Sequence, residues 1–322
     1  MVHHNNSIDI AFCVNNEYVK YMCVTIISIL ENNHENFINF HILTDYISKK
    51  NYKKIKEILD AHQNCCLKIY EVEDSILKGL KTLDWTIHAW YRILIPLILP
   101  KEINKILYLD ADTLILNNLD NLFKINMQNK SVAGVMDIVN FKDINIFDKL
   151  GFINRDIYIC SGVLLMNLEF WRSNDLTKRI IEWAHLNKNI LKFPDQDSIN
   201  IICKDSKIVL PLQYGILNEF FKWDIFYSDK LINQIKDCIN NPIIVHYTCK
   251  PWHKDAEIHI YYSQWMYYNN KLKYPVKKSY CTKPSFLKLK IMIWNLFHPE
   301  GRQYVKLEDI KRKIYKIEKK MV

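Results

Sequence analysis

The chain has 322 residues, 49% of them hydrophobic, with 44 Lys and Arg against 35 Asp and Glu and a formal net charge of +9; this suffices for one large α/β domain with an appendage. No apolar run reaches the roughly 18 to 20 residues of a membrane span, and six glycines are too few for a glycine-rich phosphate cradle. The nine cysteines lack the spacing of a structural zinc site, and the first residues lack the pattern of a secretory signal, so a cytoplasmic protein with reduced thiols is expected.

Strand-like and helix-like patterns alternate through the first 250 residues. Strands are expected at 8–14, 38–43, 66–72, 105–109, 131–136, 162–166 and 243–247, and helices at 18–30 and 49–61. Ser48 is a suitable N-cap for the second of these helices. The alternation predicts an α/β fold, Rossmann-like, in which a mostly parallel sheet carries helices on both faces.

Beyond residue 255 the pattern becomes helical, with helices expected at 257–270, 284–297 and 307–320. Residues 271–322 hold 13 Lys and 2 Arg against four carboxylates, a net charge of +11. We therefore expect one α/β domain over 1–255 and a basic, helical C-terminal segment over 256–322. The lysines favour a segment that lies on an anionic membrane surface, and the alternative is a core-packing or solvated helical face.

Two carboxylates follow a short apolar run in LYLDADT, residues 107–113. The run suits a strand buried on both faces, which puts Asp110 and Asp112 at its carboxyl end, where ligands bind in open α/β sheets. Two such carboxylates repel each other unless a cation neutralises them, so a divalent metal is the simplest interpretation. The Asp-x-Asp pattern alone carries little weight, because Asp195 and Asp197 form a second one.

A third metal ligand is expected from another strand end. His246 follows the apolar stretch at 242–245, and Lys250 comes four residues later, where an ammonium can meet phosphate as a point charge. Alone, His246 is more often a satisfied core histidine. Together with Asp110 and Asp112 it completes a candidate site for a cation that bridges a diphosphate.

Seven segments follow one another in a recognisable order. They are IAFCVNNEYVKYMCVTIISI, WYRILIP, LYLDADT, AGVMD, SGVLLMNLEFW, FPDQDSIN and HYTCKPWH. In this order the chain, over most of residues 8–255, resembles the retaining glycosyltransferases of family 8. That family has the GT-A fold and includes bacterial lipopolysaccharide-core glucosyl- and galactosyltransferases and, more distantly, glycogenin. The resemblance implies the same fold here, with a helix at WYRILIP.

The resemblance also implies a UDP-sugar donor and a Mn²⁺ (or Mg²⁺) ion. Asp110, Asp112 and His246 match the ligands of that ion, which binds both phosphates. Nucleotide contacts are implied at Cys13, Asn15, Glu17, Tyr18, Asp110, Ala111 and Lys250. Among these, Tyr18 matches the residue that stacks on uracil, and Lys250 matches the phosphate-binding lysine.

Donor-sugar contacts are implied at Arg92, Asp137, Cys160, Asp195 and Gln196. Gln196 matches a position near C1 of the sugar, where a double displacement would need a nucleophile, and an amide oxygen is a poor one. We therefore expect front-face substitution with retention, in which Asp195 and Gln196 are the catalytic residues. Asp195 as a transient nucleophile is the alternative.

Three positions depart from the family pattern. Asn15 stands where Asp is usual and Glu17 where Asn is frequent, so ribose contacts are expected to differ. Cys160 replaces a common Asn, which could alter the sugar preference. HYTCKPWH is shorter than usual, so Lys250 could fall short of the phosphates.

The leading interpretation is a metal-dependent, retaining transferase that moves glucose or galactose from UDP to a lipopolysaccharide-type core oligosaccharide. It would work at the cytoplasmic face of a membrane, as a peripheral protein. A protein or soluble glycan acceptor is the alternative within enzymes. A basic-tailed nucleic-acid-binding protein is less favoured, because no stacking or groove-binding motif accompanies the charge, and no nucleic acid is expected as a partner. A pseudoenzyme that binds UDP without turnover is also conceivable.

Overall fold

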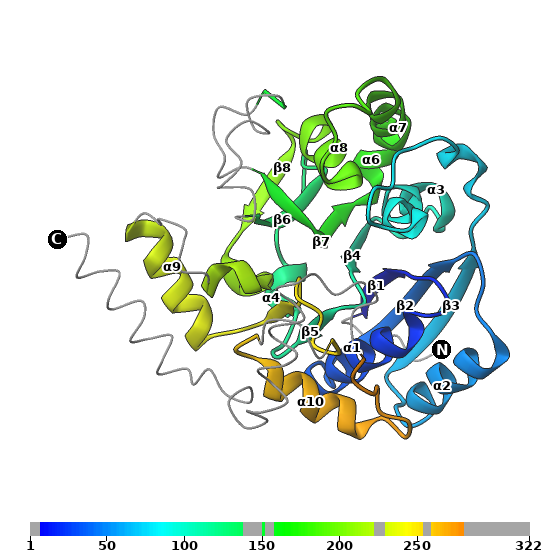
Figure 1. Ribbon diagram of the computed structural model, residues 1–322, viewed down its shortest axis with the longest axis vertical. Coiled ribbons are helices and arrows are strands. Elements are labelled where there is room, and N and C mark those ends of the chain that lie inside the picture. The colour runs from blue at the N-terminus through cyan, green and yellow to red at the C-terminus, as the bar shows by residue number, and fades with distance from the viewer. Residues whose placement is uncertain (1–6, 138–149, 152–157, 222–228, 254–258, 280–322) are drawn as a thin grey trace.

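The computed structural model describes residues 7–137, 150–151, 158–221, 229–253 and 259–279. Its centre is a seven-stranded sheet in the order β3-β2-β1-β4-β7-β6-β8, and three short strands form a second sheet in the order β5-β10-β9 (Figure 1). The strands are β1 (Ser7–Cys13), β2 (Phe37–Thr44), β3 (Cys65–Glu71), β4 (Lys105–Leu109), β5 (Thr113–Ile115), β6 (Val132–Met136), β7 (Ile159–Asn167), β8 (Lys207–Leu210), β9 (Ile216–Leu217) and β10 (Ile244–His246).

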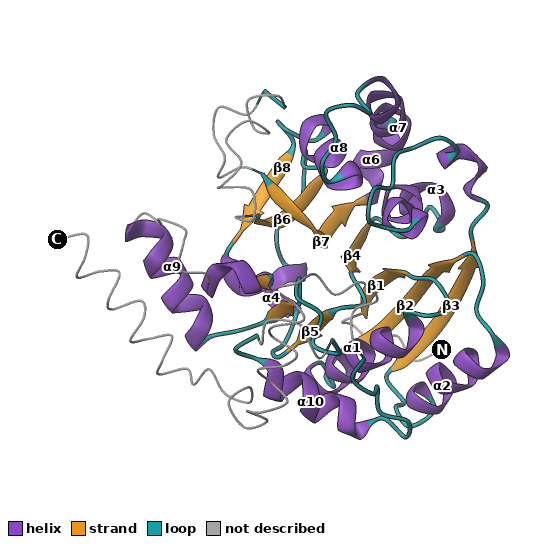
Figure 2. Cartoon of the chain, in the orientation of Figure 1, coloured by secondary structure: helices purple, strands orange, loops and turns teal. Residues whose placement is uncertain are grey.

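Helices surround the sheets (Figure 2). The α-helices are α1 (Val19–Asn32), α2 (Lys49–Leu59), α3 (Ile95–Ile98), α4 (Asp120–Phe123), α6 (Leu168–Ser173), α7 (Leu176–Leu186), α8 (Pro194–Ile202), α9 (Asp229–Asn240) and α10 (Tyr262–Lys271). The 3-10 helices are η1 (Asp74–Leu77), η2 (Ile87–Leu94), η5 (Leu212–Tyr214) and η6 (Asn218–Phe221).

The central sheet is buried on both faces, as its apolar strands predict. In β1, Ile10 and Phe12 belong to one hydrophobic cluster with α1, whereas Ala11 belongs to another with η2, α6 and α7. Successive side chains of a strand point to opposite faces, so one apolar run supplies both cores. The expected α/β architecture, a mostly parallel mixed sheet with helices on both faces, is confirmed.

Local sequence signals account for α2. Ser48 lies in the extended region and its hydroxyl accepts a hydrogen bond from the Asn51 amide at 3.3 Å, as expected of an N-cap. Ile55 and Leu59 face the core while Lys49, Lys50 and Lys53 are exposed. The amphipathic pattern therefore sets both the start of the helix and the face that it buries.

Two features differ from the expectations. The segment WYRILIP is mostly the 3-10 helix η2 followed by the short α3, which has Pro96 in its first turn. In addition, β7 runs antiparallel to both β4 and β6. Because β7 is reversed, its amino end lies beside the carboxyl end of β4, and Asp110 donates its amide to the Gly162 carbonyl at 2.8 Å.

The described C-terminal part packs on the main domain. The helix expected at 257–270 is α10, which begins at Tyr262 and lies along α1, with Trp265 and Tyr268 in the same core cluster as that helix. The helices expected at 284–297 and 307–320 lie outside the described residues, so the division of the chain at 255 stays a prediction. No helix in the described ranges is long and apolar enough to cross a membrane, and no disulfide joins the described cysteines.

Candidate active site

The candidate metal ligands come from both sheets. Asp110 directly follows β4, Asp112 directly precedes β5, and His246 is the last residue of β10. β5 and β10 pair antiparallel, with Thr113 opposite His246, and the Tyr247 amide donates to the Asp112 carbonyl at 2.9 Å. The small sheet therefore holds His246 against the end of the large one.

The three side chains meet as the sequence predicted. His246 Nε2 lies 3.7 Å from Asp110 Oδ2 and 3.4 Å from Asp112 Oδ1, and the three ligand atoms lie within 4.8 Å of one another. Asp112 and His246 are buried, and Asp110 is partly exposed. Two carboxylates and one imidazole are ligands that suit a divalent ion of the manganese or magnesium type, with open positions for substrate oxygens.

Gly162 provides the space in which these ligands meet. A Cβ at this position would lie 2.2 Å from His246 Cε1 and 2.8 Å from Asp110 Oδ2, closer than real contacts allow. The absence of a side chain on β7 thus lets an imidazole and a carboxylate converge on one point. A metal site needs this convergence, because its ligands must all reach the same ion.

Asp110 is held in its charged form. Arg92 Nη2 lies 3.1 Å from Asp110 Oδ1, and the Tyr108 hydroxyl donates to the same oxygen. Burial alone would raise the pKa of Asp110, but Arg92, His246 and the Tyr108 hydrogen bond outweigh it and lower the pKa. The carboxylate is therefore ionised and able to bind a cation at neutral pH.

Lys250 and Cys160 also reach this cluster. Lys250 Nζ donates to Asp112 Oδ2, so the short 246–253 segment brings this lysine to the metal site. Whether it also reaches a phosphate stays a prediction. Cys160 Sγ lies 3.6 Å from His246 Nδ1, so the thiol contacts the ring nitrogen that faces away from the carboxylates. Ala111, between the two aspartates, accepts a hydrogen bond from Thr25 Oγ1 at 3.2 Å through its carbonyl.

Four of the five residues expected at the donor sugar, all except Cys160, are joined in one group by hydrogen bonds and ion pairs. Arg92 Nε lies 3.3 Å from Asp195 Oδ2, and the Ser161 hydroxyl donates to that same oxygen at 3.0 Å. Gln196 accepts the Ser161 amide at 2.9 Å through Oε1 and donates through Nε2 to Asp137 Oδ2 at 2.6 Å. Burial raises the pKa of Asp195, against the opposing effects of Arg92 and Ser161.

The second Asp-x-Asp triplet has a different role for each member. Asp195 faces Arg92, whereas Asp197 accepts the Tyr158 hydroxyl on one oxygen and the amides of Lys192 and Phe193 on the other, at 2.8 and 2.9 Å. Asp197 thereby fixes the turn that begins α8 and the position of Asp195 on it. Its carboxylate is structural.

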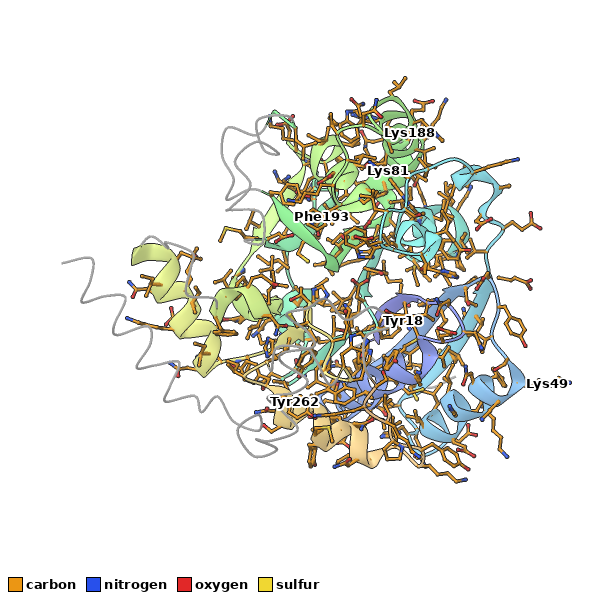
Figure 3. All side chains as sticks on the ribbon, in the orientation of Figure 1. Tyr18, Lys49, Lys81, Lys188, Phe193 and Tyr262 are labelled. Atoms are coloured by element: carbon orange, nitrogen blue, oxygen red, sulfur yellow. The ribbon has the colours of Figure 1, made fainter. Side chains whose placement is uncertain are left out.

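The residues expected at the nucleotide base lie at the end of β1 and the start of α1. Asn15 Oδ1 accepts the Tyr18 amide at 3.0 Å, which closes the turn that leads into α1. The Tyr18 ring is 37% exposed (labelled in Figure 3), and Glu17 is exposed beside it. Cys13 ends β1, and burial raises the pKa of its thiol. These four residues lie between the end of β1 and the start of α1, and their contacts with a nucleotide stay a prediction.

Sequence reasoning missed four residues that organise the site. They are Tyr108, Tyr158, Ser161 and Gly162. Ser161 and Gly162 lie at the amino end of the reversed β7, whereas the sequence predicts ligand sites at the carboxyl ends of strands. A glycine inside an apolar strand pattern was the one available signal, since it marks a close approach of another group.

Comparisons with known proteins show the family of this chain. The family model described as "Glycosyl transferase family 8" matches residues 9–256. A lipopolysaccharide 1,2-glucosyltransferase of Escherichia coli is 28% identical over 76% of this chain and 73% of its own length. A lipopolysaccharide 1,3-galactosyltransferase of Salmonella typhimurium is 23% identical, with 76% and 73% covered.

Solved structures show the same fold. The galactosyltransferase LgtC, solved with donor and acceptor sugar analogs, aligns with a TM-score of 0.72 at 23% identity, covering 83% of this chain and 97% of its own. The central sheet and the site at the end of β4 thus belong to a GT-A fold. Since the family model covers most of the chain, the protein belongs to glycosyl transferase family 8 and is a glycosyltransferase.

Proposed function

We propose that this protein is a retaining, metal-dependent transferase that moves a hexose, glucose or galactose, from UDP to a lipopolysaccharide-type core oligosaccharide. The observation that carries the proposal is the convergence of Asp110, Asp112 and His246 within 4.8 Å of one another. Arg92 joins this cluster directly to Asp195, which belongs to the group expected at the donor sugar. A diphosphate and the sugar attached to it need two such adjoining subsites.

Asp110, Asp112 and His246 would hold Mn²⁺ or Mg²⁺, which supplies Lewis-acid stabilisation of the charge on departing UDP. Lys250 supports the same step, because its ammonium already lies at Asp112 and a lysine can meet phosphate as a point charge. Arg92 is fixed between Asp110 and Asp195, so it orients both carboxylates and keeps them from repelling each other.

The hydrogen bonds at Asp195 and Gln196 favour front-face substitution. Asp195 is engaged by both Arg92 and Ser161 through the same oxygen, which lowers its nucleophilicity and restrains its movement. Gln196 is fixed through both ends of its amide, to Ser161 and Asp137, so its place is set before a sugar binds. Both residues would stabilise an oxocarbenium-like state by position and charge, without a covalent intermediate.

The proposed donor sugar and acceptor are those that the names of the relatives print. The named relatives transfer glucose or galactose to lipopolysaccharide, and 28% and 23% identity leave the sugar open between the two. We infer UDP as the carrier from the resemblance to family 8. Tyr18, which matches the residue that stacks on uracil, is 37% exposed and follows the turn closed by Asn15. A lipid-linked acceptor would place the enzyme at the cytoplasmic face of a membrane.

The test is UDP release from UDP-glucose and UDP-galactose with Mn²⁺, with and without a core oligosaccharide, in wild type and in Asp110→Asn/Asp112→Asn. We expect one donor to be hydrolysed slowly and transferred faster when acceptor is present, and the double variant to lose both activities. Retention of the anomeric configuration in the product would be read by NMR.

The matched control is Asp205→Asn/Asp237→Asn, which makes the same change at two exposed carboxylates outside the site. It should retain full activity. UDP release that persists in Asp110→Asn/Asp112→Asn would contradict the metal site. Mn²⁺-dependent UDP binding without release from any donor, even with acceptor, would instead identify a pseudoenzyme. A covalent sugar adduct on Asp195 would replace front-face substitution by double displacement.

A further inference from the structure

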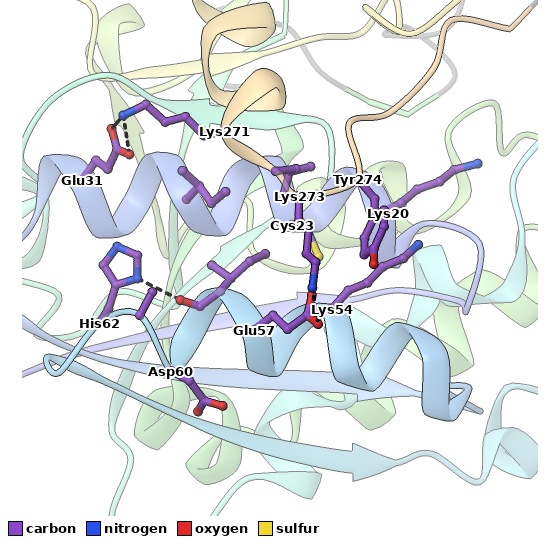
Figure 4. A pocket seen from close by; sticks show the side chains of 14 residues that line it. Lys20, Cys23, Glu31, Lys54, Glu57, Asp60, His62, Lys271, Lys273 and Tyr274 are labelled. Carbon is purple, nitrogen blue, oxygen red and sulfur yellow. Dashed lines mark hydrogen bonds and ion pairs between the residues drawn. The ribbon is translucent and has the colours of Figure 1, made fainter.

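A second pocket lies away from the candidate active site, between α1, α2 and the chain that leaves α10 (Figure 4). Its volume is about 550 Å³. The polar residues that line it are Lys20, Cys23, Glu31, Lys54, Glu57, Asp60, His62, Lys271, Lys273 and Tyr274. The pocket is therefore dominated by ionisable groups from three separate parts of the chain.

The carboxylates of the pocket are already paired. Glu31 binds Lys271 at 2.7 Å, Glu57 binds Lys273 at 3.3 Å, and Asp60 binds Lys56 at 2.9 Å. Lys20 and Lys54 have no carboxylate partner within the described part of the chain. In Figure 4 these two side chains extend towards the same end of the pocket, beside Tyr274. That end of the pocket carries uncompensated positive charge.

The segment 271–279 is held in place over this pocket. The side chain of the buried Asn269 accepts the Val276 amide at 2.7 Å and donates to its carbonyl at 3.2 Å. The Ser279 amide donates to the Trp252 carbonyl at 2.9 Å. These contacts position the lysines of the segment on the surface of the folded domain.

The pocket opens on a wider basic face. The ranges 19–32, 49–60 and 271–279, which build this face, carry ten lysines and three carboxylates. Lys49, Lys50 and Lys53 on α2 are exposed, as are Lys277 and Lys278. We call the surface made by these three ranges the α2 face. Its excess of positive charge attracts a surface that carries many negative charges.

Two observations favour a lipid bilayer among anionic partners. Tyr267 and Tyr274 are 55% and 59% exposed, and lysine ammoniums lie 4.5 and 5.6 Å from their ring centroids. Tyrosine is suited to a membrane interface, with an apolar body and a polar tip. The sequence that continues from Ser279 holds 9 Lys and 2 Arg against four carboxylates, so the basic character carries on along the chain.

We propose that the α2 face docks on an anionic phospholipid surface, with the end of the pocket between Lys20 and Lys54 receiving a phosphate headgroup. The purpose of this docking rests on the proposed function, because it would bring the enzyme to a lipid-linked acceptor. The binding of the surface to phospholipid does not depend on that function. Sequence alone pointed to residues 271–322 as the membrane-binding segment, whereas this surface lies largely on the folded domain. Lys20 is two residues after Tyr18, so the face begins beside the expected nucleotide site.

The test is co-sedimentation of the full chain with phosphatidylcholine vesicles that contain or lack phosphatidylglycerol. We expect binding only to the anionic vesicles. Lys20→Gln/Lys53→Gln/Lys54→Gln should weaken it about a hundredfold, since each lysine near an acidic leaflet contributes a factor of about five. The matched control is Lys101→Gln/Lys178→Gln/Lys188→Gln. It removes the same charge in α7 and just after α7 and α3, elements that lie away from α2 (Figure 1). The control should bind within about twofold of wild type.

Equal losses in the two triple variants would reduce the effect to net charge and overturn the proposal, as would undiminished binding of the α2-face variant. Binding of the wild type to single-stranded RNA but not to anionic vesicles would overturn it as well, in favour of a nucleic-acid surface. UDP release in vesicle-free buffer and the thermal midpoint should match wild type in both variants. If the wild type binds anionic vesicles but releases no UDP from any donor, the proposed function fails and the docking surface stands.

Discussion

The position of Gly162 shows how strictly single residues constrain the candidate metal site. His246 and Asp110 occupy the space that any side chain at 162 would need, with atoms 2.2 and 2.8 Å from a Cβ there. One methyl group therefore decides whether the imidazole and the carboxylate can converge. Cys160, two residues earlier on the same strand, contacts the other nitrogen of the imidazole at 3.6 Å.

We predict that Gly162→Ala weakens Mn²⁺ binding about a hundredfold, because the added methyl group displaces His246 and Asp110, which can then no longer bind the same ion. Overpacking should also cost about 1 to 3 kcal/mol of stability. Titration calorimetry with Mn²⁺ and thermal unfolding would measure the two effects. Gly134→Ala is the control, since its Cβ would meet Ile159 and Leu164 at 3.0 and 3.2 Å in the core. It should lose stability without losing metal affinity, and equal metal affinity in both variants would contradict the prediction.

At the scale of elements, an aromatic stack joins the 246–253 segment to α1. The rings of Tyr21 and Trp252 are parallel within 12°, with centroids 3.6 Å apart, and Tyr18 meets Trp252 edge-on at 6.3 Å. Lys250 belongs to the turn that this stack secures. The stack therefore joins the expected base platform to the turn that carries the expected phosphate lysine.

We predict that Trp252→Leu lowers UDP affinity about three- to tenfold relative to Trp252→Phe, because an aromatic pair contributes about 0.5 to 1.5 kcal/mol beyond buried area. Both variants lose indole volume, so the comparison isolates the stacking. Fluorescence titration with UDP and Mn²⁺ would measure it. Identical affinities for the two variants would show that the stack does not position the turn.

A second element-scale prediction concerns His259, which precedes α10 and packs against Phe221, Tyr247 and Tyr261. Burial lowers the pKa of His259 to about 3, against 6.5 for an exposed imidazole. Below pH 6.5 the imidazole of His259 is protonated in the unfolded chain but stays neutral in the folded one. The free energy of unfolding therefore falls as the pH falls towards 3. By pH 4.5 this single group should cost about 2 to 3 kcal/mol.

Urea unfolding of wild type and His259→Gln between pH 7 and 4.5 would measure this effect. Other groups contribute to both proteins, so the informative quantity is the difference between the two pH dependences. The variant should be less stable at pH 7 and should lose less free energy of unfolding on acidification. Parallel curves would mean that His259 protonates in the folded state without penalty.

For the whole molecule, the sequence predicted the strands of the large sheet better than the existence of the small sheet and the direction in which β7 runs. Long strands such as 105–109 and 38–43 have enough apolar residues to be recognised, and they set the α/β class. The strand predicted at 243–247 contains β10, but its partners β5 and β9 have only three and two residues, too few for a periodic pattern, and so the small sheet was not predicted as a sheet. The direction of β7 was not predicted either, because a continuous apolar run does not distinguish parallel from antiparallel pairing.

The part of the candidate site that could be predicted is the set of metal ligands, because few residue types can bind a metal ion. Asp110, Asp112 and His246 stood out as potential ligands after apolar runs, and the structure brings them together. Ser161 carries no such signal, and Gly162 carries only the weaker one of a glycine inside an apolar strand pattern. Their importance comes from the reversal of β7, a tertiary feature that no local pattern records.

The two sheets meet only a few residues from the metal ligands, and this has a consequence for the stability of the whole chain. Asp110 extends from the large sheet, whereas His246 ends a strand of the small one. An ion bound by both would join the sheets, and it binds the folded state only. At a hundred times its dissociation constant such a ligand adds about 2.7 kcal/mol.

We therefore predict that Mn²⁺ with UDP raises the midpoint of thermal unfolding by about 4 °C, because about 2.7 kcal/mol is divided by an unfolding entropy of about 0.7 kcal/mol/K for a chain of 322 residues. Scanning calorimetry with Mn²⁺ and UDP, and with a chelator in place of Mn²⁺, would measure the shift. Asp110→Asn/Asp112→Asn should show no shift with Mn²⁺, while Asp205→Asn/Asp237→Asn should show the full one. A shift that survives in the first variant would mean that the stabilising ion binds elsewhere, and the two sheets would then be held together by packing alone.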